Sequence, residues 1–164
     1  MSTEQASESI AITLEVNGQR RSDRVEPRLT LVDFLRHRLE LTGTHVGCEH
    51  GVCGACHVRV DGTIVRGCLM LAVQADGTTV ETIEGLSASG EIADLQEAFV
   101  RRNAMQCGFC TPGVLILAAE LVSSNTVLSR KQIRDALSGC FCRCTGYQAI
   151  VDAIEEVARS RLEA

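Results

Sequence analysis

Cysteine is the residue type in this sequence with the greatest capacity for chemistry, because the 164 residues include nine of them. An odd number of cysteines cannot close into a complete set of disulfides. Residues 1–9 are polar and acidic, and Arg20-Arg21 is not followed by an apolar run, so we expect no export signal. In a reducing compartment, cysteines are more often metal ligands than disulfides.

The first cysteine set has a spacing typical of an iron–sulfur loop. Cys48, Cys53 and Cys56 follow the pattern C-x4-C-x2-C of plant-type [2Fe–2S] proteins, and Cys68 can supply a fourth thiolate. The glycines within 47–56 permit positive φ and leave room for backbone amides to point at sulfur. Such amides stabilise the reduced cluster. A four-cysteine zinc site is the alternative, but zinc sites usually repeat short paired-cysteine knuckles.

Three histidines, His45, His50 and His57, flank this loop. They could replace cysteines in a Rieske-like arrangement, in which two histidines bind one iron. That arrangement would leave cysteines surplus. We therefore interpret the histidines as surface residues or as residues that support the cluster without binding it.

The second cysteine set is less specific. Cys107 and Cys110 form a C-x2-C pair, and Cys140, Cys142 and Cys144 alternate further along the chain. The pair with two of these three would make a four-thiolate site, which suits zinc and [2Fe–2S] about equally. Spacing does not decide which of the three is left out.

Hydrophobic periodicity indicates the elements that must position these cysteines. In the first half, alternation predicts strands over residues 10–16, 19–25, 58–60, 63–65 and 79–83. Asn17-Gly18 and Asp61-Gly62 are strong hairpin signals, and Thr30 with Asp33 approximates a capping box before a helix that reaches Leu39. Strands packed on one helix, with a cysteine-rich loop between them, predict a β-grasp ferredoxin domain.

The second half has helical periodicity. Apolar stripes predict four helices, over residues 92–99, 111–121, 133–137 and 147–158. Ser129 with Gln132 forms a capping box before the third helix, and Thr145 with Gln148 caps the fourth, whose stripe includes Tyr147. We place the domain boundary near residue 85. The chain is thus predicted to be α+β, with a β-grasp domain over 1–84, in which 1–9 are disordered, and a helical domain over 85–164.

Composition excludes several classes of protein. The formal net charge is −5 and the basic residues are dispersed, so nothing favours nucleic-acid binding. No apolar stretch approaches the roughly 18 residues of a membrane span, and we expect a cytoplasmic protein. Aromatic residues make up only 3% of the chain, and small cores of this kind usually need a metal or disulfide staple.

At this point three stretches resemble the small iron–sulfur subunits of the molybdenum hydroxylases, a family that includes xanthine oxidases and aerobic carbon monoxide dehydrogenases. They are Leu41-Thr-Gly-Thr44 leading into the first cysteine loop, Gln106-Cys-Gly-Phe-Cys-Thr-Pro-Gly113, and Cys142-Arg-Cys-Thr-Gly-Tyr147. The resemblance covers about residues 10–158 and joins two motifs of separate domains in the family's order.

The resemblance implies a β-grasp [2Fe–2S] domain followed by a four-helix [2Fe–2S] domain. It assigns the flavin-proximal cluster to Cys48, Cys53, Cys56 and Cys68. It assigns the molybdenum-proximal cluster to Cys107, Cys110, Cys142 and Cys144. By the same resemblance, Gln106 and Cys144 lie close to the pterin of the molybdenum cofactor.

The resemblance also implies partners. A large subunit would hold the molybdenum cofactor and a medium subunit would hold FAD, in a heterotrimer or a dimer of heterotrimers. This chain would relay electrons between them and would not turn over substrate alone, and its sequence does not identify the substrate. The alternatives are a free-standing two-cluster ferredoxin-like carrier and a structural zinc module.

The sequence departs from the family pattern at three positions, none of which removes a predicted ligand. Cys140 replaces a common Asn, His57 a common Thr, and Val114 a common Met. Cys140 follows Gly139, which is predicted to end a helix. We therefore expect Cys140 to be a free, largely buried thiol.

Overall fold

A computed structural model describes residues 9–123 and 126–163, so residues 1–8 of the segment 1–9 that was predicted to be disordered lie outside the described part of the chain. The last residue of that segment, Ser9, is placed and accepts hydrogen bonds from Arg24. The first half forms one five-stranded sheet in the order β2-β1-β5-β3-β4. Its strands are β1 (Ile10–Val16), β2 (Gln19–Val25), β3 (His57–Val60), β4 (Thr63–Arg66) and β5 (Thr79–Glu81). β1 pairs antiparallel with β2 and parallel with β5, whereas β3 pairs antiparallel with both β4 and β5.

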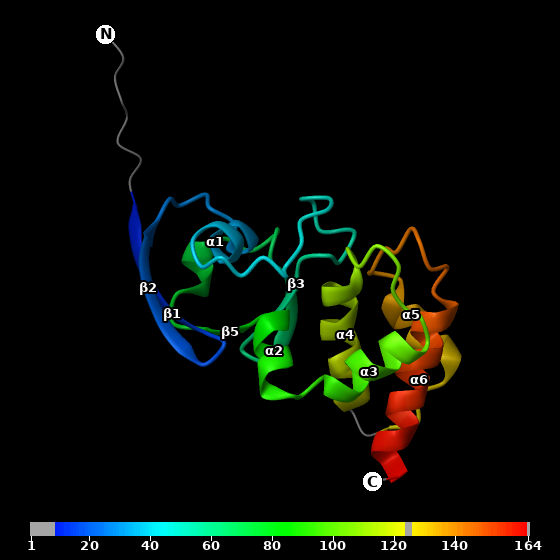
Figure 1. Ribbon diagram of the computed structural model, residues 1–164. Helices are drawn as coiled ribbons and strands as arrows, with labels where there is room; N and C mark the ends of the chain where they lie inside the picture. Colours follow the sequence, from blue (N-terminus) through cyan, green and yellow to red (C-terminus); the bar gives the residue numbers. More distant parts are fainter. Residues whose placement is uncertain (1–8, 124–125, 164) are drawn as a thin grey trace.

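Alternation decides which face of this sheet is buried. Ile12, Leu14 and Val16 of β1 point inward and are 2% exposed, whereas β2 is almost entirely polar and exposed. A charged edge strand of this kind discourages pairing with another chain. Helix α1 (Leu31–His37) and the short 3-10 helix η1 (Ala72–Ala75) cover the inner face (Figure 1). This is the predicted β-grasp arrangement.

Thr30 begins α1 as predicted. Its hydroxyl accepts a hydrogen bond from the amide of Asp33, three residues into the helix. Such a cap satisfies an amide that has no partner within the helix. Leu31, Phe34 and Leu35 then point into the sheet and are fully buried, which fixes where the loop after α1 departs toward the first cysteine set.

The second half is helical and contains one more helix than predicted within the described ranges. The helices are α2 (Ile83–Ser89), α3 (Ala93–Arg101), α4 (Thr111–Ser123), α5 (Arg130–Leu137) and α6 (Gln148–Glu163). α2 was missed because Gly85 lies inside it and the residues before it continue a strand pattern. A Cβ at Gly85 would collide with the side chain of Asn17, which hydrogen-bonds the amide and the hydroxyl of Thr82 at 2.9 Å.

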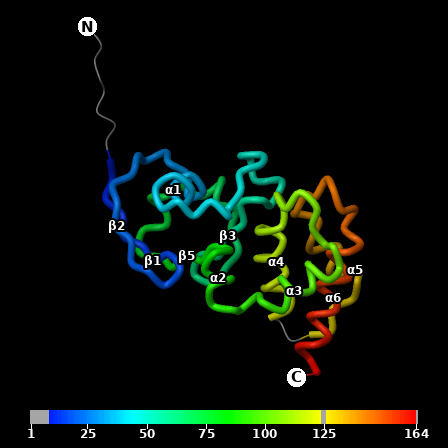
Figure 2. Tube along the Cα trace, in the orientation of Figure 1, coloured from blue at the N-terminus to red at the C-terminus, as the bar shows by residue number. Residues whose placement is uncertain are grey.

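Helix α4 is the centre of the helical half. Its own buried residues, which run from Gly113 to Val122, are not confined to one face, as expected for a helix that packs against several others. It contacts β3 of the sheet as well as α2, α3, α5 and α6, so it joins the two halves (Figures 1 and 2). Cys110 directly precedes its first turn, where Gly113 packs against Gly54 of the first cysteine loop. No helix of the described ranges is long and apolar enough to cross a membrane.

Candidate metal centres

Three cysteines of the first set, Cys48, Cys53 and Cys56, lie on the loop between α1 and β3, and Cys68 lies just after β4. The four thiols come in two pairs. Cys48 Sγ accepts hydrogen bonds from the amides of Val52 and Cys53, at 3.3 and 3.4 Å. The thiols of Cys56 and Cys68 hydrogen-bond to one another. Gly51 and Gly54 have φ of +77° and +73°, and Leu69 or Gly139 would block a side chain at these positions. The glycine-rich loop therefore does what its composition predicted.

The electrostatics of this set differ between its two ends. The amides of Cys53, His50 and Val52 lower the pKa of Cys48 to about 6, with Cys53 contributing most. Burial raises the pKa of Cys56 to about 12. A thiolate is thus favoured at Cys48, whereas the buried Cys56 needs a metal ion to hold its anionic form.

The second set also comes in two pairs, which bring together residues from two distant loops. Cys107 Sγ lies 3.6 Å from Cys144 Sγ, and the thiols of Cys110 and Cys142 hydrogen-bond to one another. Burial, followed by the Cys142 thiol, raises the pKa of Cys110 to about 12. Burial also raises the pKa of Cys142, but hydrogen bonds with Thr145 outweigh it and the pKa is lowered.

Cys140 lies apart from this set. Its side chain is 1% exposed, and its Sγ is 3.7 Å from Nδ1 of His57 in the other half of the molecule. Burial raises the pKa of this thiol to about 11. The amide of Cys140 still bonds to the carbonyl of Leu137, so the chain is turning out of α5 here and is not extended. The three cysteines consequently do not all face the same side.

Two residues, Thr145 and Tyr147, hold the second loop in shape. The hydroxyl of Tyr147 accepts a hydrogen bond from the amide of Cys142 at 2.7 Å and donates one to the carbonyl of Cys140 at 3.0 Å. Thr145 Oγ1 lies 3.1 Å from Cys142 Sγ and accepts from the amide of Tyr147. The sequence predicts Thr145 as a helix cap and Tyr147 as part of an apolar stripe. The position of the tyrosine hydroxyl, between the cysteines and the helix, is the sequence feature that indicates a role in the loop.

The pairing of the thiols tests which metal they fit. Across the residues that the structure describes, no three His, Cys, Asp or Glu side chains group around a position for one metal ion. Tetrahedral zinc needs four ligands around one such position. A [2Fe–2S] cluster instead takes four thiolates across two irons. Two sets of paired thiols fit two-iron clusters better than zinc.

The loops of the two sets meet at the junction between the sheet and the helices. The amide of Phe141 donates to the carbonyl of Cys53 at 2.8 Å. Gly54 and Gly113 touch so closely that a side chain on Gly113 would strike the carbonyl of Gly54. His57 is buried, with Nδ1 3.3 Å from the carbonyl of Gly113. His57 therefore supports this junction.

One edge of the second set is open. Cys107, Cys144 and Gln106 are exposed, and so are Phe109 (47%) and Phe141 (54%), which neighbour them in the chain. Gln106 and Cys144, which share a predicted role at the pterin, are thus both accessible. In Figure 1 this edge lies where the loops before α4 and before α6 meet, at the end of the helices farthest from the C-terminus.

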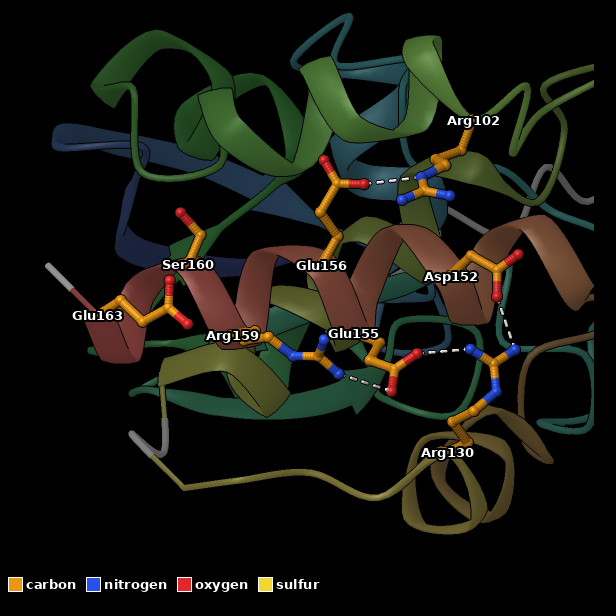
Figure 3. Close-up of a pocket in the computed structure, with 8 residues that line it drawn as sticks. All are labelled: Arg102, Arg130, Asp152, Glu155, Glu156, Arg159, Ser160 and Glu163. Atoms are coloured by element: carbon orange, nitrogen blue, oxygen red, sulfur yellow. Dashed lines mark hydrogen bonds and ion pairs between the residues drawn. The ribbon is translucent and has the colours of Figure 1, made fainter.

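A groove along α6 is lined mostly by charged side chains, and most of its charges are paired within it (Figure 3). Arg130 bonds to Asp152 and Glu155 at 2.6 and 2.5 Å, and Arg102 bonds to Glu156 at 2.7 Å. Paired surface charges of this kind contribute little each. These ion pairs tie α3 and α5 to α6, which gives the groove a structural role.

Comparisons with known proteins agree with this architecture. Residues 14–85 match the family model described as "2Fe-2S iron-sulfur cluster binding domain", and residues 82–155 match the one described as "[2Fe-2S] binding domain". The chain is 51% identical to the nicotine 6-hydroxylase small subunit of Paenarthrobacter nicotinovorans, covering 94% of this chain and 93% of the relative. It is 50% identical to caffeine dehydrogenase subunit gamma of Pseudomonas sp. (strain CBB1), over 92% of each.

Solved structures give the same result. A chain of quinoline 2-oxidoreductase from Pseudomonas putida 86 superposes with a TM-score of 0.89 at 46% identity, covering 96% of this chain and 99% of that one. Aldehyde oxidoreductase from Desulfovibrio gigas superposes with a TM-score of 0.82 at 40% identity, and this chain corresponds to 17% of that longer chain.

Fold, paired thiols and both family models define the class: a protein with two [2Fe–2S] clusters that serves as an electron-transfer subunit of an oxidoreductase complex. The identity over nearly the full length is specific enough to go further. The chain belongs to the family of small iron–sulfur subunits of the molybdenum hydroxylases.

Proposed function

We propose that this subunit relays electrons from a molybdenum cofactor, held by a large subunit, through its two clusters to FAD, held by a medium subunit. A bound [2Fe–2S] cluster supplies reversible one-electron storage, and the chain supplies the thiolates, the hydrogen bonds and the spacing. Under this proposal Cys107, Cys110, Cys142 and Cys144 bind the cluster nearer molybdenum. The flavin-proximal cluster is bound by Cys48, Cys53, Cys56 and Cys68.

The observation that carries the proposal is the open edge of the second thiol set. Two of its four thiols, Cys107 and Cys144, are exposed, and the half-exposed Phe109 and Phe141 lie within three residues of them in the chain. Exposed apolar side chains near a redox centre are typical of a protein contact. We propose that the large subunit covers this edge, which brings Gln106 and Cys144 to the pterin.

Copurification tests the proposal. The tagged chain, produced together with candidate large and medium subunits, should elute as one complex that contains molybdenum, FAD and iron. Phe141→Asp should release the subunit, because it places a charge in the apolar contact. Val127→Asp is the matched control, since Val127 is 85% exposed on the loop before α5. A chain that elutes alone, with both clusters and no partner, would instead be the free-standing carrier.

A further inference from the structure

The segment before the first thiol set also contacts the loop that contains Cys107 and Cys110. This contact involves side chains and is independent of the backbone bond between Phe141 and Cys53. The rings of His45 and Phe109 stack with their centroids 4.7 Å apart and their planes at 15°. Nδ1 of His45 lies 2.8 Å from the carbonyl oxygen of Phe109. A carbonyl can only accept, so this nitrogen carries the proton and donates.

The positions of the two residues in the chain give this contact its significance. His45 lies three residues before Cys48 of the first set, and Phe109 directly precedes Cys110 of the second. The stack and the hydrogen bond therefore act between segments that belong to different clusters. A side chain with both contacts to one partner is held in orientation as well as in place.

The ring of Phe109 also lies near a thiol of the first set. A methyl group placed on Gly47 would meet Sγ of Cys53 at 3.1 Å and Cε1 of Phe109 at 3.5 Å. The ring edge and the sulfur thus flank the same point above Gly47. Phe109 is continuous through its own backbone with Cys110, so one side chain spans the gap between the two thiol sets.

We infer that Phe109 is the side-chain bridge for electron transfer between the clusters, and that His45 is the positioning residue that holds its ring. This inference rests on the proposed function. In the bridged step one electron leaves the reduced second cluster and enters the oxidised first cluster, and no bond is made or broken. The direction follows the proposed relay from molybdenum to flavin.

Flash reduction of the full-length, iron-loaded chain tests the bridge. One electron is added, its equilibration between the clusters is timed, and iron content and EPR of the fully reduced chain are measured in parallel. Phe109→Ala and His45→Ala should each lose the fast inter-cluster phase while both EPR signals and the iron content stay at wild-type values. Phe109→Tyr should retain the fast phase, and so should Val127→Ala, which changes an exposed apolar side chain outside both thiol sets.

The double variant decides whether the residues act as a unit. If His45 acts only through Phe109, His45→Ala should add nothing to Phe109→Ala. A fast phase that survives in both single variants would overturn the inference, and so would loss of iron from both, which would make the pair a cluster-retention element. A wild-type chain without two EPR signals would instead overturn the proposed function.

Discussion

The amide of Phe141 donates a hydrogen bond to the carbonyl of Cys53 at 2.8 Å, and this bond joins the two loops that carry the thiol sets. The two halves of the molecule therefore meet at loops that contain predicted cluster ligands. Loss of either cluster should disturb both halves, because each loop is braced on the other.

Cys53→Ala and Cys107→Ala are each expected to give an unstable or insoluble subunit. Domains of this size keep only about 3–5 kcal/mol of stability from a single core, so the metal contributes directly to folding. Thermal unfolding followed by circular dichroism measures the loss, and chelation of iron from the wild-type chain should reproduce it. Recovery of a well-folded iron-free chain with native circular dichroism would contradict this expectation.

Cys140 and Cys142 should respond differently to substitution. Cys140→Asn is expected to leave both EPR signals and electron transfer nearly unchanged, because its thiol faces His57 and lies apart from the paired thiols. Cys142→Ser should disturb the cluster nearer molybdenum and slow the reduction of the flavin. If Cys140→Asn removes one signal while Cys142→Ser does not, the assignment of ligands in this loop is wrong.

The ion pair between Arg161 and Asp94 should stabilise the helical half in a pH-dependent way. Nε and Nη2 of Arg161 donate to both carboxylate oxygens, at 2.7 and 2.8 Å, and these bonds lower the pKa of Asp94. A lowered pKa in the folded state adds stability above the unfolded pKa of about 4 and loses it as the pH falls further.

Arg161→Ala should therefore cost about 1 kcal/mol or less near pH 7, since solvent screens the partly exposed pair. The difference from wild type should shrink as the pH falls below about 4, because Asp94 is protonated first in the unfolded chain and only at lower pH in the folded chain. Urea unfolding at both pH values measures it. Arg28→Ala is the control, because the Arg28–Glu26 pair is largely exposed. A difference that grows on acidification would refute the ion-pair explanation.

Much of the fold was predictable because local patterns decide it. β1 and β2 have the predicted bounds, and Thr30 and Ser129 cap α1 and α5 as predicted. The predicted strand over 79–83 is shorter in the structure and ends at Glu81. The buried Thr82 precedes α2 and is held by Asn17 from the first hairpin, a contact that no local pattern contains.

The site was predictable only in part, because contacts between distant segments are not contained in local sequence patterns. Spacing grouped Cys48, Cys53 and Cys56, but it left Cys140, Cys142 and Cys144 equivalent. What separates these three is tertiary: the turn out of α5 and the Tyr147 hydroxyl direct the loop. The stack of His45 on Phe109 likewise depends on the packing of α4 against the sheet. The domain boundary near residue 85 and the assignment of ligands remain predictions.

Iron and acid-labile sulfide per chain, measured together with EPR of the fully reduced protein, test the central claim most directly. Two clusters of two irons each give four irons, which should be matched by four sulfides and two distinguishable EPR signals, with no zinc. About two irons per chain in intact protein, or zinc in place of iron, would contradict the two-cluster account.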